Sequence, residues 1–136
     1  WIEACGSELR GVEVQADEVP AALDELPLLA VVATRAWGRT QIRGAGELRH
    51  KECDRIHHLV VELRRMGACI REQAEGFEVE GPVRLRGAAV RCHGDHRLEM
   101  SLAVAALSAA EPTRLLGAGY SHVSFPEFWD LLPGRR

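Results

Sequence analysis

The stretch GDHRLEMSLAVAALSAAEP (residues 94–112) predicts a helix that is apolar on nearly every side. Asp95 is placed to cap its first turn, and a helix without a polar face has to be buried on all sides. The stretch DELPLLAVVATRAWG (24–38) follows the same scheme, with Asp24 as the expected cap and Gly38 at the end. Two such helices predict a fold in which helices lie inside, covered by other elements.

Short alternating segments surround these helices and predict strands. They lie at residues 8–14, 39–44, 68–72, 76–81, 83–87 and 113–117. An amphipathic helix is expected to begin near Lys51 and to end at Gly67, and another begins within 124–132. The same order of elements recurs in the two halves. We therefore expect an α+β fold of two similar units, approximately residues 1–66 and 67–136.

The composition is that of an ordinary globular protein, with 46% hydrophobic and 27% charged residues. A formal net charge of −3 argues against general nucleic-acid binding. No apolar run is long enough to span a bilayer, and no secretory signal is visible, so no membrane partner is expected. The four scattered cysteines are typical of reduced thiols, which favours a cytoplasmic protein. Because the chain opens on Trp1, we expect it to be processed or a piece of a longer protein.

Charged residues crowd the stretch LRHKECDRIHHLVVELRRMG (48–67) just ahead of its helical pattern. If the helix begins near Lys51, then Lys51 and Arg55 stand one turn apart and repel each other unless an anion lies between them. The free N–H groups of the helix start favour the same anion, and Glu52 beside it could move a proton. The alternative is a solvated helix end with an ordinary Glu52–Arg55 pair.

A second cluster, Asp95-His96-Arg97, opens the apolar helix. Arg97 has few solvated alternatives there and could bind a carboxylate or phosphate through two hydrogen bonds. The alternative is a capping Asp95 with an Arg97 whose charged end reaches solvent. Asp24 holds the equivalent place in the first half, either as a further cap or as a carboxylate that accepts the proton of a substrate hydroxyl.

The five residues Cys53, His57, Cys92, His93 and His96 are candidate metal ligands by type. Their spacing matches no standard zinc pattern, so no metal is expected. The sequence also lacks the glycine-rich nucleotide-binding motifs and the G-x-S-x-G motif of serine hydrolases.

Four ordered motifs resemble the EPSP synthase family, the 3-phosphoshikimate 1-carboxyvinyltransferases: DELPLLAVVA, ELRHKECDRI, GDHRLEMSLAVAAL and SFPEFWDLL. Lys51, Glu52, Asp54 and Arg55 match the family's Lys-Glu-x-Asp-Arg pattern. Residues 95–97 match its Asp-His-Arg. The resemblance spans essentially the whole chain but only about the C-terminal third of a family member.

The resemblance implies a fold of two similar domains, each built from three βαβαββ units as an inside-out α/β barrel with its helices buried inside the sheets. The active site lies in the cleft between the domains. This chain would then be a partial domain of two units, with the missing N-terminal part of the same enzyme as its partner. The family transfers enolpyruvyl from phosphoenolpyruvate to the 5-hydroxyl of shikimate 3-phosphate, in aromatic amino acid biosynthesis, without a metal or organic cofactor.

The resemblance also implies roles for individual residues. Asp24 would accept the proton of the shikimate 5-hydroxyl, and Glu52 would donate a proton to the phosphoenolpyruvate methylene. Lys51 would contact shikimate 3-phosphate, while Arg55 and Arg97 would bind phosphoenolpyruvate. Half of the cleft has no counterpart here, so we expect the fragment alone to be inactive.

The sequence leaves two other identities of the chain open. The chain could come from the related UDP-N-acetylglucosamine enolpyruvyl transferase, or it could be a non-catalytic α/β module that binds a phosphorylated metabolite or a partner chain. Some family members carry a lysine where this chain has Val123, so one phosphoenolpyruvate contact is expected to be lost. Two units without a third would leave apolar surface uncovered, so we expect self-association.

Overall fold

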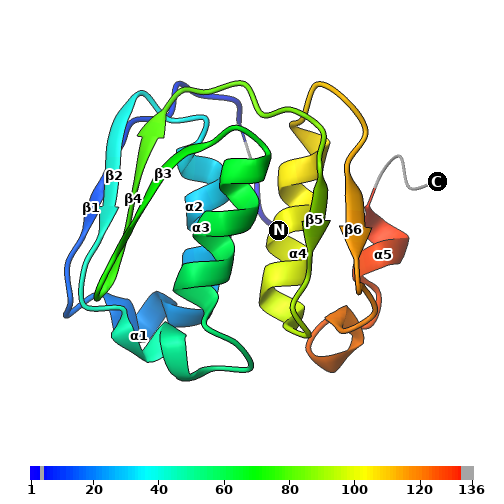
Figure 1. Cartoon of the computed structure of the whole chain (residues 1–136). Coiled ribbons are helices and arrows are strands. Elements are labelled where there is room, and N and C mark those ends of the chain that lie inside the picture. The colour runs from blue at the N-terminus through cyan, green and yellow to red at the C-terminus, as the bar shows by residue number, and fades with distance from the viewer. Residues whose placement is uncertain (4, 133–136) are drawn as a thin grey trace.

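The computed structural model describes residues 1–3 and 5–132. Two sheets enclose a layer of helices (Figure 1). The elements are, in chain order, β1 (Glu13–Val14), α1 (Val19–Ala22), η1 (Leu23–Glu25), α2 (Leu26–Ala33), β2 (Gly38–Ile42), η2 (Gly46–His50), α3 (Arg55–Arg65), β3 (Cys69–Gln73), β4 (Gly76–Gly81), β5 (Ala89–Arg91), α4 (His96–Leu107), β6 (Arg114–Leu116), η3 (Ser121–Val123) and α5 (Phe128–Leu131).

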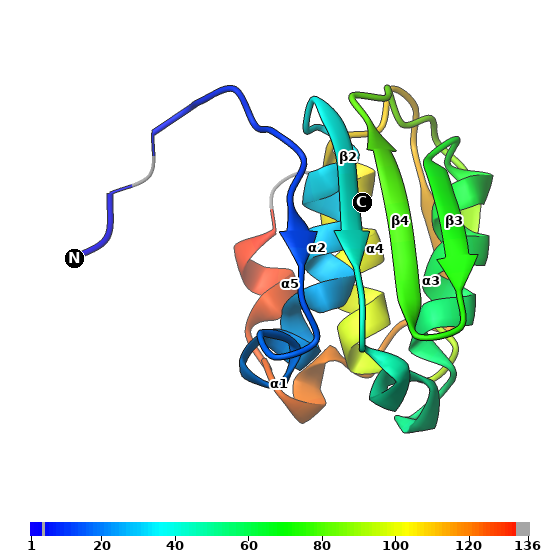
Figure 2. The ribbon, with the colours of Figure 1, turned by 90° about the vertical axis from the view of Figure 1, so that its left-hand side faces the viewer.

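The larger sheet has the strand order β1-β2-β4-β3. β1 and β2 run parallel, because α1 and α2 carry the chain back between them, and β4 is antiparallel to both β2 and β3. Gly38 lies opposite Gly81, and Ile42 lies opposite Phe77. The smaller sheet is a parallel pair, β5 and β6, joined through α4. Figure 2 shows the four strands of the larger sheet lying in front of the helices.

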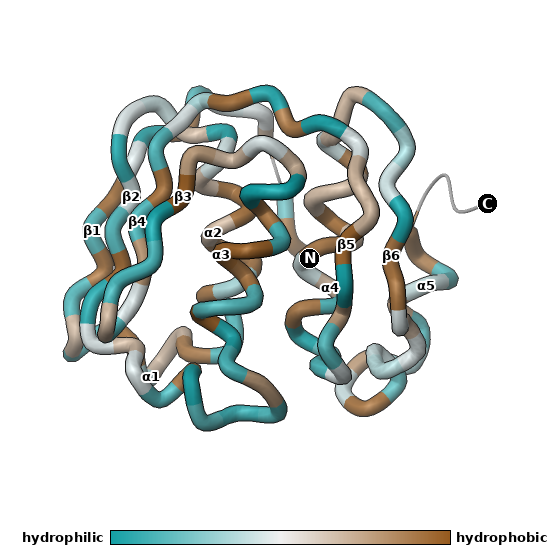
Figure 3. The backbone as a smooth tube through the Cα atoms, viewed as in Figure 1, coloured by the Kyte–Doolittle hydropathy of each residue, from teal (hydrophilic) through white to brown (hydrophobic). Residues whose placement is uncertain are grey.

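Helices α2, α3 and α4 pack against one another between the two sheets. The buried hydrophobic core draws on these helices and on strands of both sheets, and Figure 3 shows hydrophobic residues recurring along them. The core draws side chains from every layer, among them Leu26 of α2, Leu63 of α3, Phe77 of β4 and Leu102 of α4, all fully buried. The periodic pattern of residues 56–66 therefore places α3 correctly, with its apolar face toward α2 and α4.

The prediction that the apolar helices are buried on all sides is wrong for α2 within the described residues. Leu28 and Val32 are 39% and 40% exposed, one turn apart on the same face of the helix. Their neighbours Leu26 and Ala30 are fully buried. An apolar pattern shows that a helix has no polar face, but it does not show which elements of this chain cover each side.

One of the two predicted aspartate caps is present at the start of its helix. Asp95 caps α4 as expected, because its carboxylate accepts hydrogen bonds from the backbone N–H groups of Arg97 and Leu98. Asp24 does not cap α2, which begins at Leu26 after the 3-10 turn η1 and has no side-chain cap. The helix predicted over 24–38 is therefore shorter at both ends.

The strand predicted at 83–87 is wrong, and β5 lies at Ala89–Arg91 instead. The backbone N–H of Val83 donates to the carbonyl of Thr34, and that of Arg86 donates to the carbonyl of Met66. These groups bind the ends of two helical segments instead of a neighbouring strand, so alternation alone was misleading here. The helix predicted within 124–132 is only the single turn α5.

The two sheets divide the chain between Gly81 and Ala89. The pattern of the sequence placed the unit boundary after Met66, before the hairpin of β3 and β4. That hairpin pairs with β2 of the larger sheet, a long-range contact that local periodicity does not contain. Residues 133–136 of the expected second unit lie outside the described residues.

Candidate active site

Three segments that are far apart in the sequence meet where α2, α3 and α4 begin, at the lower edge of Figure 1. Asp24 comes from η1, just before α2. Glu52 and Arg55 come from the start of α3, and the pair of Asp95 and Arg97 comes from the start of α4. The positive ends of α3 and α4 add to the field at this site.

Arg55 joins these three segments through its guanidinium group. Its Nη1 lies 2.9 Å from Asp24 Oδ1, its Nη2 lies 2.6 Å from Glu52 Oε2, and its Nε lies 2.7 Å from Asp95 Oδ2. The Arg55 side chain is only 2% exposed. A planar guanidinium with donors on three nitrogens suits such a meeting of carboxylates. Through Arg55, the charged residues around the first turn of α3 therefore connect this helix to η1 and to the start of α4.

The protonation of Arg55 is secured by its partners. Burial alone would lower the pKa of its guanidinium, but the hydrogen bond and charge of Asp95, the charge of Glu52 and the hydrogen bond of Asp24 outweigh burial and raise that pKa. The exposed fractions of the partners differ: Asp95 is completely buried, whereas the Asp24 and Glu52 side chains are 46% and 41% exposed. Asp95 is therefore the fixed partner, and the other two carboxylates can turn toward solvent.

Asp95 performs two tasks at once. Its Oδ1 caps α4, and its Oδ2 binds Arg55 and also lies 3.7 Å from the Cys53 sulfur. Burial and the nearby Asp95 charge raise the pKa of the Cys53 thiol to about 12. The sequence indicated the cap, but it gave no signal for the pairing of Asp95 with Arg55.

Arg97 lies on the other side of Asp24. Its Nη2 is 3.5 Å from Asp24 Oδ2, and its Nη1 is 3.2 Å from Glu25 Oε1. The Arg97 Nε is buried and has no hydrogen-bond partner among the described residues. Asp24 thus stands between two guanidinium groups.

A hollow of about 220 Å³ opens beside Arg97. Both charged and apolar side chains line it. Its lining residues are Asp24, Glu25, Leu28, Arg97, Met100, Ser101, Val104, Phe125 and Phe128.

Lys51 is placed differently from the prediction. The helix begins only at Arg55, after the Asp54 carboxylate has capped it by accepting from the His57 N–H at 2.9 Å. The prediction that Lys51 and Arg55 share a helix face is therefore wrong. The Lys51 ammonium instead forms an ion pair with Glu47.

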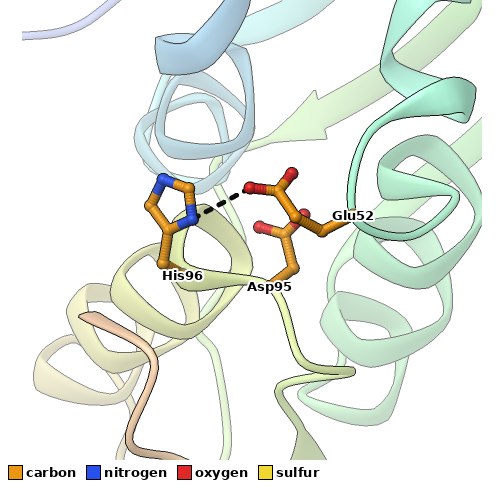
Figure 4. Close-up of side chains that lie close together, drawn as sticks. All are labelled: Glu52, Asp95 and His96. Atoms are coloured by element: carbon orange, nitrogen blue, oxygen red, sulfur yellow. Dashed lines mark ion pairs between the residues drawn. The ribbon is translucent and has the colours of Figure 1, made fainter. Parts of the chain in front are cut away.

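Glu52, Asp95 and His96 form a compact group (Figure 4). The His96 Nδ1 lies 3.1 Å from Glu52 Oε1, and one ligand atom of each residue lies within 4.8 Å of the others. The Arg55 guanidinium already binds one oxygen of each carboxylate, so a metal ion at these atoms would face a fixed positive charge. Of the metal candidates weighed from the sequence, this group contains His96 alone.

Comparison with known proteins identifies the family. Residues 1–132 match the family model of EPSP synthase (3-phosphoshikimate 1-carboxyvinyltransferase). The chain belongs to the EPSP synthase family. It is 46% identical over 126 residues to the 3-phosphoshikimate 1-carboxyvinyltransferase of Thermodesulfovibrio yellowstonii, an alignment that covers 93% of this chain and 29% of that relative.

Solved structures support the EPSP synthase family assignment. The EPSP synthase of Acinetobacter baumannii superposes with a TM-score of 0.86 and 35% identity, over 91% of this chain and 29% of that one. The enolpyruvyl transferase NikO of Streptomyces tendae has a TM-score of 0.67 at 22% identity, over 90% of this chain and 27% of that one, which indicates a shared fold alone. The predicted family and the predicted enolpyruvyl transferase fold are thus confirmed.

The chain spans 29% of the length of the first curated relative that it matches. Within residues 1–3 and 5–132, no helix has the length and apolar character needed to cross a membrane.

Proposed function

We propose that this chain supplies one side of the active site of an enzyme that transfers enolpyruvyl from phosphoenolpyruvate to the 5-hydroxyl of shikimate 3-phosphate. The observation that carries the proposal is the placement of Asp24 between Arg55 and Arg97, beside a hollow that Asp24 and Arg97 line. The remaining part of the site belongs to sequence beyond this 29% of the relatives' length. The cytoplasmic location is part of the same proposal.

Arg97 is suited to hold one anionic group of phosphoenolpyruvate. Its contacts with Asp24 and Glu25, at 3.5 and 3.2 Å, are long for charge-assisted hydrogen bonds, which are usually about 2.7–2.9 Å. A phosphate or carboxylate in the hollow could replace both carboxylates at the two terminal nitrogens of the guanidinium group. Arg55 would take part by exchanging its exposed partners for substrate while it keeps buried Asp95.

Asp24 and Glu52 are suited to the two proton transfers. In the addition step, the substrate hydroxyl oxygen bonds to the central carbon of phosphoenolpyruvate while Asp24 takes the hydroxyl proton and Glu52 protonates the methylene carbon. Elimination then returns a proton from the new methyl group to Glu52 and releases phosphate, which takes up the proton that Asp24 held. His96 holds Glu52 through the 3.1 Å contact. The guanidinium groups of Arg55 and Arg97 stabilise the negative charge that develops during the reaction. The mechanism uses no cofactor.

Lys51 remains a predicted contact of the shikimate 3-phosphate group. Its partner Glu47 is an exposed side chain, and such surface pairs contribute about 0–1 kcal/mol. An incoming phosphate could therefore draw the Lys51 ammonium away from Glu47 at little cost.

A chimera tests the proposal. This chain would replace the matched segment of the Thermodesulfovibrio yellowstonii relative, and phosphate release would be measured with both substrates. We expect turnover, and we expect Asp24→Asn and Glu52→Gln each to lower kcat by roughly 100-fold or more. Arg97→Lys should raise the KM for phosphoenolpyruvate about tenfold, with little change in the KM for shikimate 3-phosphate.

The matched control is Glu13→Gln, which removes a surface partner of Arg43. It should leave kcat and the KM values for both substrates unchanged. A folded chimera without turnover, or with UDP-N-acetylglucosamine as the preferred acceptor, would overturn the proposal. The purified 136-residue chain should release no phosphate by itself, because it contributes only part of the cleft.

A further inference from the structure

Glu99 is a buried carboxylate that the proposed chemistry does not use. It lies in the first turn of α4 and is completely buried. Its Oε2 accepts from the backbone N–H groups of Gly119 and Tyr120, at 2.9 and 2.7 Å. Its Oε1 accepts from the Trp129 indole Nε1–H at 2.9 Å. Burying a charge is costly unless it is hydrogen-bonded, so three donors directed at one carboxylate indicate a built contact.

The donors to Glu99 belong to the two ends of one segment, residues 119–129. Between them lies Phe125, which lines the hollow together with Phe128 next to Trp129. The two phenylalanine rings have centroids 6.0 Å apart, and Phe128 also contacts the Trp129 ring at 5.3 Å. The contact through Glu99 therefore holds the segment that supplies the aromatic wall of the hollow.

One face of α4 lines the hollow, and another carries Glu99. Arg97, Ser101 and Val104 line the hollow, and their spacing places them on one face of the helix. Glu99 is two residues from Arg97, so it points away from that face. The segment 119–129 thus contacts α4 on the Glu99 side and reaches the hollow with its phenylalanines.

We propose that Glu99 is a positioning residue that fastens residues 119–129 to α4 and thereby sets the aromatic part of the lining of the hollow beside Arg97. Its link to phosphoenolpyruvate rests on the proposed function. The segment 119–129 contains no lysine or arginine, so its contribution to the hollow is shape and apolar contact. Loosening the wall should therefore weaken ligand binding more than it slows the chemical steps.

Two near-isosteric variants isolate the contact. In Glu99→Gln, the amide oxygen can still accept from Gly119 and Tyr120, but the amide nitrogen cannot accept from the Trp129 indole. Trp129→Phe removes the indole donor and keeps an aromatic ring. If Glu99 and Trp129 act together, the KM for phosphoenolpyruvate in the double variant should rise no more than in the more strongly affected single variant. Glu111→Gln is the matched control, because Glu111 also binds a backbone N–H, that of Gly87, but away from the hollow.

The first measurement is amide hydrogen exchange of the 136-residue chain. A neutral amide oxygen accepts more weakly than a carboxylate, and the Trp129 contact is lost in Glu99→Gln. We therefore expect exchange at Gly119 and Tyr120 to become about tenfold faster in this variant, with α3 amides unchanged and the Glu111→Gln control like the parent. Unchanged exchange at Gly119 and Tyr120 would overturn the proposal whatever the substrate is.

The second measurement uses the chimera. We expect Glu99→Gln and Trp129→Phe to raise the KM for phosphoenolpyruvate about tenfold, with kcat and the KM for shikimate 3-phosphate changed by less than about threefold. Faster exchange with an unchanged KM would overturn the positioning role. If the unmodified chimera has no turnover, the proposed function fails, while the exchange result still decides whether Glu99 holds the segment.

Discussion

Arg55 and Asp95 form an ion pair in which both side chains are almost completely buried. The Arg55 Nε lies 2.7 Å from Asp95 Oδ2, and the two side chains are 2% and 0% exposed. The pair connects the starts of α3 and α4, which belong to different parts of the fold. Each member is also held by further hydrogen bonds, so neither charge is left unsatisfied in the interior.

Removing Asp95 should destabilise the protein more than removing any surface partner. Asp95→Ala leaves the buried Arg55 charge without its fixed partner and α4 without its cap, so we expect the free energy of unfolding to fall by about 3–5 kcal/mol. Asp95→Asn keeps a capping oxygen and should lose less. Urea unfolding measures both values. Equal, small losses for Asp95→Ala and for Glu13→Ala, the removal of a surface partner of Arg43, would contradict this expectation.

His58 should make the stability of the chain depend on pH. Burial, followed by the charges of His93 and His57, lowers its pKa, and its ring stacks on His93 with centroids 3.7 Å apart. Asp54 and Glu62 act in the opposite direction but do not prevail. The unfolded state therefore binds the proton more tightly, and stability should fall as the pH drops below about 6.5.

The variant His58→Gln should reduce the loss of unfolding free energy between pH 7.5 and pH 5.5. Urea titrations at the two pH values measure it. His50→Gln, at an exposed histidine in η2, is the control and should keep the loss of the parent. A loss that is the same in all three proteins would show that His58 does not carry the effect.

The four thiols should fall into two classes of reactivity. Burial, followed by the charges of Asp95 for Cys53 and of Glu99 for Cys92, raises the pKa of each of these thiols to about 12. At pH 8 only about one in ten thousand of the Cys53 or Cys92 side chains would be a thiolate. Both thiols should therefore react slowly with Ellman's reagent until the chain is unfolded. Cys5 and Cys69 are exposed and should react fast. In Cys69→Ser one fast thiol should remain; four equal rates would contradict the assignment.

The exposed face of α2 should promote self-association. Val32 is an apolar side chain on that face, and a charge there opposes burial in an interface. We expect the purified chain to sediment as more than a monomer and Val32→Glu to shift it toward the monomer. Val12→Glu places the same charge at an exposed valine beside β1 and should have no such effect. A clean monomer without dye binding to exposed apolar surface would refute the expectation.

Much of the fold could be predicted because its signals are local. The period of residues 56–66 places α3, and the strand expected over 76–81 coincides with β4. The misplaced strand at 83–87 and the uncovered face of α2 have another origin. Both depend on which distant element lies beside a segment, and one sequence does not contain that information.

The site could be predicted in part. Asp24, Lys51, Arg55 and Arg97 were expected to share a site. The structure joins Asp24 to both arginines, whereas Lys51 pairs with Glu47. The buried Arg55–Asp95 pair was not expected, because a cap already explained Asp95. Glu99 does leave a signal in the sequence, because an acidic residue inside an apolar helix needs a buried partner.

The connection between β4 and β5 has a consequence for dissecting the molecule. It is the crossing from one sheet to the other, and it separates Asp24 and Arg55 on one side from Asp95 and Arg97 on the other. Cleavage there would yield two peptides, each with half of the charged network. Their reassociation would restore the Arg55–Asp95 pair, which makes this crossing a natural point for splitting the gene into two complementing fragments.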